Sequence, residues 1–306
     1  MNSLFSEKTT PMTQLLSAAF KRADVTVWMK REELNHPTIQ GNKLYKLKYN
    51  LEAALAEQKK TLLTFGGAYS NHIAATAAAA KALGLNSIGI IRGQELAGNP
   101  DKWSHTLKAA HQNGMTFQFV TRIDYRNKSD EKNLRELQAT YPDSFIIPEG
   151  GSNALAIRGF ESLTDQIETQ IPDWTHLFTA VGTGGTLAGL VRYAQLKPQR
   201  KIQGIPVLKQ GDYLQPQVEN WIGNQPVNQW QLLTEYHAGG YAKTTPELLA
   251  RMQKFEAEFG IDLDPVYTAK MVMAFYDQLE KNKIPPGSKV ILLHTGGLQG
   301  RAQKTS

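Results

Sequence analysis

The stretch that decides the fold is Val181-Gly182-Thr183-Gly184-Gly185-Thr186-Leu187-Ala188-Gly189. Residues 176–181 predict a strand, and a helix is expected to begin at about Thr186. A glycine-rich turn between a strand and a helix leaves backbone N–H groups free, and the helix dipole adds partial positive charge. We therefore expect residues 182–186 to form a phosphate site.

This loop differs from two well-known nucleotide-binding patterns. No lysine follows its last glycine before Ser or Thr, so it is not a P-loop. The residue three positions after Gly184 is Leu187 instead of glycine, and no acidic residue lies about 20 positions further on. The loop therefore suits a single phosphate monoester better than a nucleotide, and a tight turn without a ligand is the structural alternative.

Outward from this loop, short β-rich runs alternate with helical segments. Strands are predicted at 25–29, 61–65, 87–91, 116–120, 144–147, 176–181, 202–206 and 289–294. Helices are predicted at 71–83, 103–112, 131–140, 155–168, 186–195, 213–221, 246–259 and 269–281. Such alternation indicates an α/β fold with parallel sheets and helices on both faces.

Three of the predicted strands run into glycines. Besides the loop after Val181, these are Phe65-Gly66-Gly67 and Thr295-Gly296-Gly297. Ligands in open α/β sheets bind beyond the carboxyl ends of the strands, where glycine lets the backbone approach a ligand closely. Three such ends in one chain favour a cleft lined by strand ends.

The composition narrows the class of protein. With 306 residues the chain is expected to form about two domains, and the absence of cysteine excludes disulfides, thiolate metal sites and a catalytic cysteine. We expect no metal site. The N-terminus lacks a secretory pattern, and no apolar stretch is long enough to span a membrane. The net charge of +6 comes from scattered basic residues without a nucleic-acid-binding signature. These features fit a cytoplasmic protein that binds neither membranes nor nucleic acid.

A second stretch with chemical content is Gly41-Asn42-Lys43-Leu44-Tyr45-Lys46-Leu47. A lysine at a Gly-Asn turn can present its amine to a pocket, where burial lowers its pKa and frees the neutral amine for a Schiff base. If a helix begins near Lys43, Lys46 lies on nearly the same face. Lys46 could then neutralise a phosphate or lower the pKa of Lys43.

A third stretch, Gly66-Gly67-Ala68-Tyr69-Ser70-Asn71-His72, opens an alanine-rich helix. Ser70 is well placed as its N-cap. Ser70 and Asn71 also offer hydrogen-bonding groups that could bind a substrate carboxylate. His72 is either a general base or a hydrogen-bonded core residue, and taken alone it favours the core.

Together these stretches resemble the pyridoxal-phosphate enzymes of the tryptophan-synthase-β fold type (fold type II), in particular the branch of aminocyclopropane-carboxylate deaminase and D-cysteine desulfhydrase. The resemblance extends to Leu263-Asp264-Pro265-Val266-Tyr267-Thr268 and His294-Thr295-Gly296-Gly297, in the family's order and over nearly the whole chain. It implies pyridoxal 5'-phosphate as cofactor, a small amino acid as substrate and a homodimer.

The resemblance also implies roles for single residues. Lys43 matches the Schiff-base lysine, Lys46 a lysine on the phosphate side, and Asn71 the residue at the cofactor's phenolic oxygen. Ser70 matches the serine that meets the substrate carboxylate or handles protons. The remaining matches are the phosphate cradle (Gly182, Thr183, Gly184, Gly185 and Thr186), the active-site tyrosines Tyr267 and Tyr241, Thr295 at the pyridine nitrogen, and His72 beside the substrate.

Departures from the family pattern bear on the reaction. Residue 268 is threonine where the deaminases have a glutamate that contacts the pyridine nitrogen. A carboxylate there would keep the ring protonated, and opening a cyclopropane that lacks an α-hydrogen needs that electron withdrawal. Hydroxyls at Thr268 and Thr295 favour elimination of a good leaving group from Cβ. Gln40 and the stretch around Tyr241 also depart from the pattern, so the substrate stays open.

We therefore predict α,β-elimination from a small amino acid to a keto acid and ammonia, similar to D-cysteine desulfhydrase. Alternatives are an aminocyclopropane-carboxylate deaminase, an amino-acid racemase, or a catalytically silent binder of a phosphate ligand on the same scaffold. The expected fold has two open twisted sheets flanked by helices. Residues 46–152 would form the smaller domain, and residues 1–45 with 153–306 the larger, cofactor-binding one.

Overall fold

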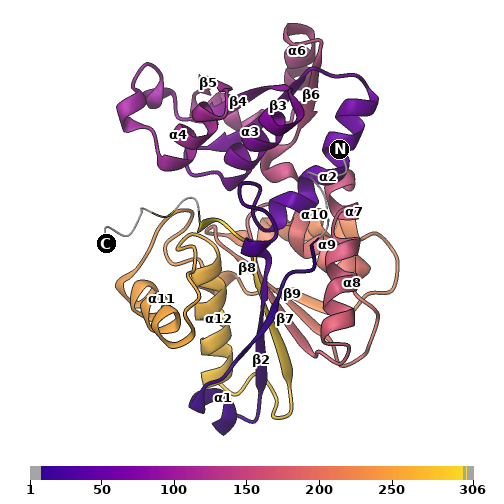
Figure 1. Ribbon diagram of the computed structural model, residues 1–306, viewed down its shortest axis with the longest axis vertical. Coiled ribbons are helices and arrows are strands. Elements are labelled where there is room, and N and C mark those ends of the chain that lie inside the picture. Colours follow the sequence, from indigo (N-terminus) through magenta and orange to yellow (C-terminus); the bar gives the residue numbers. More distant parts are fainter. Residues whose placement is uncertain (1–7, 299–300, 302–306) are drawn as a thin grey trace.

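The structure contains two separate β-sheets, one of six strands and one of four (Figure 1). The computed structural model describes residues 8–298 and residue 301. The larger sheet has six strands in the order β1 (Met12–Leu15), β2 (Thr26–Arg31), β10 (Lys289–His294), β7 (His176–Val181), β8 (Lys201–Pro206) and β9 (Gln229–Leu232). All neighbouring pairs are parallel except β1 with β2.

The smaller sheet has four strands, all parallel. Their order is β5 (Met115–Val120), β4 (Asn86–Arg92), β3 (Thr61–Gly67) and β6 (Ser144–Ile147). Because the side chains of a strand alternate between its faces, Leu62 packs on one side of this sheet and Leu63 on the other. Parallel sheets need cover on both faces, and both are covered here.

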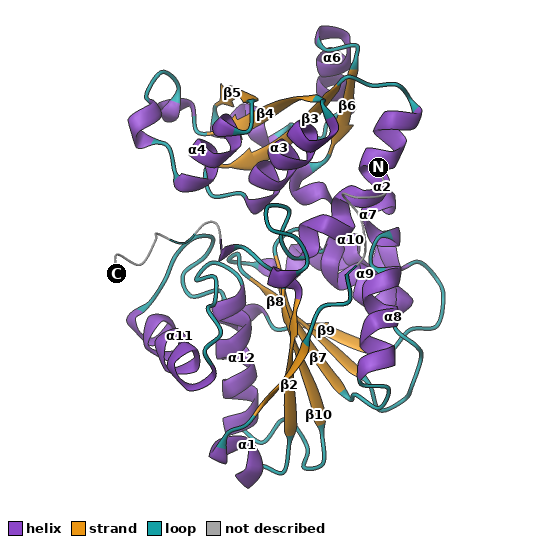
Figure 2. Cartoon of the chain, viewed as in Figure 1, coloured by secondary structure: helices purple, strands orange, loops and turns teal. Residues whose placement is uncertain are grey.

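Helices cover both faces of the larger sheet (Figure 2). On one face lie α1 (Ala18–Arg22), α11 (Pro246–Phe259) and α12 (Thr268–Glu280), whose core includes Phe20, Phe255 and Phe275. On the other lie α7 (Ala154–Arg158), α8 (Glu161–Gln170), α9 (Gly185–Tyr193) and α10 (Gln215–Ile222).

Around the smaller sheet, α2 (Asn42–Ala56), α3 (Asn71–Leu83) and α4 (His105–Gln112) pack on one side. The short α5 (Arg122–Arg126) and α6 (Glu131–Thr140) contribute Tyr125, Leu134 and Leu137 to the other side. Helix α3 is buried along most of its length, which its run of small alanine side chains permits. None of the helices described is long and apolar enough to cross a membrane.

The predicted α/β alternation is confirmed, but several elements differ from the prediction. The helices α1 and α5 were not predicted, and α2 was considered only on the condition that a helix begins near Lys43. The edge strands β1 and β9 were not predicted, and β1 makes the larger sheet mixed instead of wholly parallel. Both are four residues long and mix polar with apolar side chains, so they lack the apolar run that made the equally short β6 recognisable. The single helix predicted at 155–168 is wrong: the chain breaks at Gly159 and Phe160 into α7 and α8. Glycine has poor helix propensity, and the turn buries the Phe160 ring completely.

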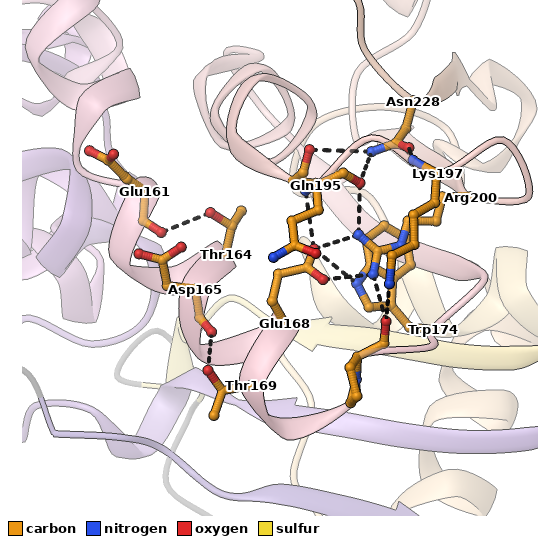
Figure 3. Close-up of polar contacts among 12 residues, drawn as sticks. Glu161, Thr164, Asp165, Glu168, Thr169, Trp174, Gln195, Lys197, Arg200 and Asn228 are labelled. Carbon is orange, nitrogen blue, oxygen red and sulfur yellow. Dashed lines mark hydrogen bonds and ion pairs between the residues drawn. The ribbon is translucent and has the colours of Figure 1, made fainter.

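A buried ion pair connects α8 to the residue just before β8 of the larger sheet (Figure 3). Arg200, just before β8, donates through both terminal nitrogens to the carboxylate of Glu168 on α8, each at 2.6 Å. Its guanidinium lies 4.2 Å from the ring centroid of Trp174 and also donates to the carbonyls of Gln195 and Pro172. Such bidentate geometry fixes the orientation of both partners.

Candidate active site

The carboxyl edges of the two sheets face one cavity of about 630 Å³. From the larger sheet it is lined by the residues after β7, including Gly182, Thr183, Gly184 and Thr186. From the smaller sheet it is lined by Gly67, Ser70, Asn71 and His72 after β3, Arg92 at the end of β4, residues of α5 after β5, and Glu149 after β6. The expectation of a cleft lined by strand ends is confirmed for the ends of β3 and β7, whereas the third glycine-rich end, residues 295–297 after β10, is not part of the cavity lining.

Lys43 projects into this cavity from the first turn of α2. The helix begins directly after Gly41, which has φ of +67° and lies so close to the neighbouring chain that a Cβ would be 1.9 Å from the carbonyl oxygen of Thr295. Only glycine satisfies both constraints. The Lys43 amine donates to Asn42 Oδ1 at 2.7 Å, and Asn42 Nδ2 donates to Thr186 Oγ1 at 2.8 Å. Asn42 thus connects the amine of Lys43 to the start of α9.

Burial lowers the pKa of Lys43 to about 8, against the opposing attraction of the Asp264 carboxylate. Burial likewise raises the pKa of Asp264 to about 7, although the backbone N–H groups of Tyr267 and Val266 favour its charged form. An amine with such a pKa has a substantial neutral fraction near neutral pH, which a nucleophilic lysine requires.

Lys46 lies one helical turn beyond Lys43 and points toward the glycine loop. Its amine donates to the carbonyl oxygen of Gly150 and to Ser152 Oγ, both at 2.9 Å, and lies 3.4 Å from Thr183 Oγ1. All three partners are neutral. Burial, followed by repulsion from Lys43, holds the pKa of Lys46 well below its usual value. An anion beside Lys46 would relieve this cost and restore the charged amine.

The glycine loop brings backbone close to that amine. At Gly185 a Cβ would lie 2.5 Å from Ser152 Oγ and 3.4 Å from the Lys46 amine. Thr183 and Ser152 are hydrogen-bonded at 2.6 Å, and α9 begins at Gly185. A buried lysine with neutral partners, two hydroxyls and a helix N-terminus form a donor set that fits a phosphate group.

Ser70, Asn71 and His72 lie on the facing edge, where α3 begins. Ser70 caps the helix by accepting from the Ile73 N–H at 3.4 Å, as predicted. The His72 side chain is buried, which agrees with the core interpretation. Its Nε2 lies 2.8 Å from Thr64 Oγ1, whose single hydrogen goes to the Ile147 carbonyl. Nε2 therefore carries the imidazole hydrogen. Burial keeps the ring neutral by lowering its pKa well below the usual value.

Tyr267 and Tyr241 form the wall on the side of the larger sheet. Their rings meet edge to face with centroids 6.3 Å apart, although Tyr241 lies in a loop and Tyr267 at the start of α12. Burial raises the pKa of Tyr241 to about 12 and that of Tyr267 well above its usual value. Both phenols are therefore proton donors, not bases, at neutral pH.

The remaining predicted residues lie outside the cavity lining. Thr295 is buried, and its backbone carbonyl accepts from the Asn42 N–H at 3.3 Å. Thr268 is buried as well, and its hydroxyl accepts from the Asp264 N–H at 2.7 Å. The proposed contact of Thr295 with the pyridine nitrogen stays a prediction.

Sequence reasoning missed several polar residues at the site. Lys270 is fully buried on α12 and donates to the Gly240 carbonyl at 2.8 Å, which fixes the loop next to Tyr241. The side chains of Arg92, Tyr125 and Glu149 line the cavity from three different strand ends. Isolated charged residues carry no pattern in the sequence. The signal that could have pointed to Arg92, Tyr125 and Glu149 is their place at or just after predicted parallel strands of one sheet.

Fold and site together show a two-sheet α/β protein in which a buried lysine of lowered pKa shares a cavity with a glycine loop whose donors fit a phosphate group. The family model described as pyridoxal-phosphate dependent enzyme matches residues 4–296. The chain belongs to this family of pyridoxal-phosphate-dependent enzymes, and its cofactor is pyridoxal 5'-phosphate.

The chain is also similar in sequence or structure to individual proteins of known or suggested activity. The chain is 31% identical to D-cysteine desulfhydrase of Klebsiella pneumoniae, over 89% of this chain and 86% of the relative. It is 30% identical to the mitochondrial bifunctional D-cysteine desulfhydrase/1-aminocyclopropane-1-carboxylate deaminase of Arabidopsis thaliana, over 91% and 74% respectively. A crystal structure of an ACC deaminase homologue superposes with a TM-score of 0.80 and 27% identity, over 98% of this chain and 95% of that one.

Proposed function

We propose that this protein is a D-cysteine desulfhydrase-like lyase that catalyses α,β-elimination from a small amino acid. The observation that carries the proposal is the placement of Lys43, with its lowered pKa, in the same cavity as the Lys46 phosphate cradle and the Ser70–Asn71 turn. Membership of the pyridoxal-phosphate family and similarity to the desulfhydrase of Klebsiella pneumoniae support it.

Bound at this site, pyridoxal phosphate would supply an electron sink for the carbanion that forms when the α-proton leaves. Lys43 would hold the cofactor covalently, and Lys46 with residues 182–186 would hold its phosphate. Ser70 and Asn71 would bind the substrate carboxylate at the N-terminus of α3. Freed Lys43, or Ser70, would take the α-proton.

Departure of the Cβ substituent completes the elimination. Tyr241 and Tyr267 are protonated and border the cavity, so either phenol can donate a hydrogen bond or a proton to the leaving group. With cysteine the Cα–H and Cβ–S bonds break, sulfur leaves as sulfide, and water converts the rest into pyruvate and ammonia.

The test combines absorbance with product analysis. The purified protein is expected to show a visible band from lysine-bound cofactor and to release sulfide and pyruvate from one enantiomer of cysteine. Lys43→Ala should lose both the band and turnover, whereas the matched control Lys254→Ala, an exposed lysine on α11, should keep both. Full activity in Lys43→Ala would refute the assignment.

Ring-opening deamination is the second candidate, because the Arabidopsis thaliana relative is bifunctional. The hydroxyl of Thr268 is already engaged by the Asp264 backbone, and it offers no carboxylate to the cavity. We therefore expect little 2-oxobutanoate from aminocyclopropane-carboxylate under conditions that give sulfide from cysteine. Loss of optical activity without ammonia would instead indicate a racemase.

We also propose a homodimer acting in the cytoplasm, with domains at 46–152 and at 1–45 plus 153–306. The resemblance to the desulfhydrase branch supports the dimer, and the lack of cysteine is compatible with a reducing compartment. Light scattering of the purified protein would test the assembly.

A further inference from the structure

The cavity is lined by more positive charge than the proposed reaction uses. Two of the basic side chains are Lys43 and Lys46, which have roles above. The others lie on the smaller-sheet side: Arg92, Arg122, Arg126 and Lys128. Among the described residues that line the cavity, Glu149 is the one with an acidic side chain.

These four residues lie at or beyond the carboxyl ends of β4 and β5, which are adjacent in the smaller sheet. Arg92 ends β4, and α5 begins directly beyond β5, its neighbour in the sheet. Arg122 and Arg126 are four residues apart on α5 and so share a face. Both are exposed and line the cavity, while Tyr125 between them is buried in the core. The fold therefore turns arginines toward the cavity.

The single acid is already engaged. Glu149 accepts from the Tyr125 hydroxyl at 2.7 Å and pairs with Lys128 at 3.0 Å. Within the part of the chain that the structure describes, Arg92, Arg122 and Arg126 form no ion pair with a carboxylate. The Arg92 guanidinium lies 5.7 Å from the Tyr125 ring centroid. Arg92 and Tyr241 line the same cavity.

We propose that the amino-acid substrate carries an anionic oxyacid group on its side chain, either a phosphate or a sulfonate. Arg92, Arg122 and Arg126 bind this group. The inference rests on the proposed function. The cofactor's phosphate and the α-carboxylate are assigned to Lys46 with the glycine loop and to the N-terminus of α3. The arginines are thus available to a third anion, and guanidinium groups match the oxygens of phosphate and sulfonate in bidentate fashion.

Such a substituent is a chemically competent leaving group. The Cα–H and Cβ–X bonds break, and the electron pair of Cβ–X leaves with X. From cysteate X departs as sulfite, and from O-phosphoserine as phosphate. The three-carbon remainder takes up one water and gives pyruvate and ammonia, so no oxidant or reductant is needed.

The experiment compares kcat/KM of the holoenzyme for pyruvate release from both enantiomers of cysteate, O-phosphoserine, cysteine and β-chloroalanine. Arg92→Gln and Arg126→Gln are tested beside the control Arg22→Gln. Arg22 is exposed on α1, which precedes the amino end of β2 (Figure 1), and it does not line the cavity. We expect an anionic substrate to be preferred over cysteine by at least about tenfold, and each cavity variant to lower kcat/KM for it by about tenfold or more. Cysteine and chloroalanine should change less than about threefold.

The comparison separates the two oxyacids, because sulfite release and phosphate release are measured independently. An equal loss for all substrates would place the arginines on the shared α-carboxylate and overturn this inference. Preference for cysteine with unaffected arginine variants would overturn it too, while leaving the desulfhydrase-like proposal intact. Absence of the visible cofactor band and of all turnover would remove the proposed function itself, and this inference with it.

Discussion

The Nζ atom of Lys46 lies 3.4 Å from Oγ1 of Thr183, although the two residues are 137 positions apart in the chain. The contact joins α2, beside the smaller sheet, to the glycine loop after β7 of the larger sheet. The amine of Lys46 donates only to neutral oxygens here, those of Gly150, Ser152 and Thr183, so an anion at this place would be a better partner for its charge. The phosphate cradle that we propose therefore draws its groups from both sheets' surroundings.

Lys46→Met tests this cradle. Methionine keeps the length of the side chain but removes the charge, so binding of the phosphate should weaken by about 10- to 100-fold, the value of a charge-assisted hydrogen bond. Titration of the apoprotein with pyridoxal phosphate and with pyridoxal gives the measurement. Affinity for pyridoxal, which lacks the phosphate, should change little. An equal loss for both compounds would show that Lys46 acts on the fold and not on the phosphate.

The pH dependence of cofactor loading follows from Lys43. Only the neutral amine attacks an aldehyde, and burial lowers the pKa of Lys43 to about 8. The rate at which the visible band forms should rise with pH and level off above about 8, whereas an ordinary lysine would continue to about 10.5. Stopped-flow absorbance from pH 6 to pH 10 measures the midpoint.

Asp264→Asn provides the matched control for that midpoint. The Asp264 carboxylate raises the pKa of Lys43, so its removal should move the midpoint to lower pH. Asparagine still offers an Oδ1 atom to the Tyr267 N–H, which keeps the loop in place. A midpoint that moves upward or stays near 10.5 in both proteins would contradict the electrostatic argument.

The two tyrosines should matter most for leaving groups that need a proton. Both phenols are protonated at neutral pH, because burial raises the pKa of Tyr241 to about 12 and raises that of Tyr267 as well. Tyr241→Phe should therefore lower kcat for cysteine by about tenfold or more, but that for β-chloroalanine by less than about threefold, since chloride leaves without a proton. Tyr267→Phe is measured in parallel. Equal losses with both substrates would indicate positioning instead of proton donation.

The Glu168–Arg200 pair predicts a stability effect remote from the site. Removing one partner leaves the other buried and unpaired, so Glu168→Met or Arg200→Met should lower the free energy of unfolding by about 3–5 kcal/mol. The double variant should lose less than the sum. Urea unfolding measures all three, with Glu131→Met in the exposed Glu131–Arg135 pair as a control below about 1 kcal/mol. Additive losses would show that the pair is not coupled.

Much of this protein could be predicted from its residues because the signals are local. Strands that run into glycines, the Gly-Asn-Lys turn and the Ser70 cap depend on backbone conformation within a few residues. Periodicity likewise predicted all the central strands and most helices, but it did not predict α1 or α5, and α2 was considered only on the condition that a helix begins near Lys43. It missed β1 and β9, which mix polar with apolar side chains, whereas the equally short but more apolar β6 was predicted. The domain boundaries at 46 and 152 stay a prediction.

The sequence by itself determined the α/β class, the glycine-rich turn after β7 and the Gly-Asn-Lys turn that opens α2, since each of these depends on contiguous residues. Only the tertiary structure decided that Lys46 meets Thr183, that Asp264 acts on Lys43, and that Arg92 lies on the same cavity as Arg122 and Arg126. The physical reason is that charge and burial act through space. The strand order of two separate sheets, which no local pattern encodes, determines which side chains share one cavity.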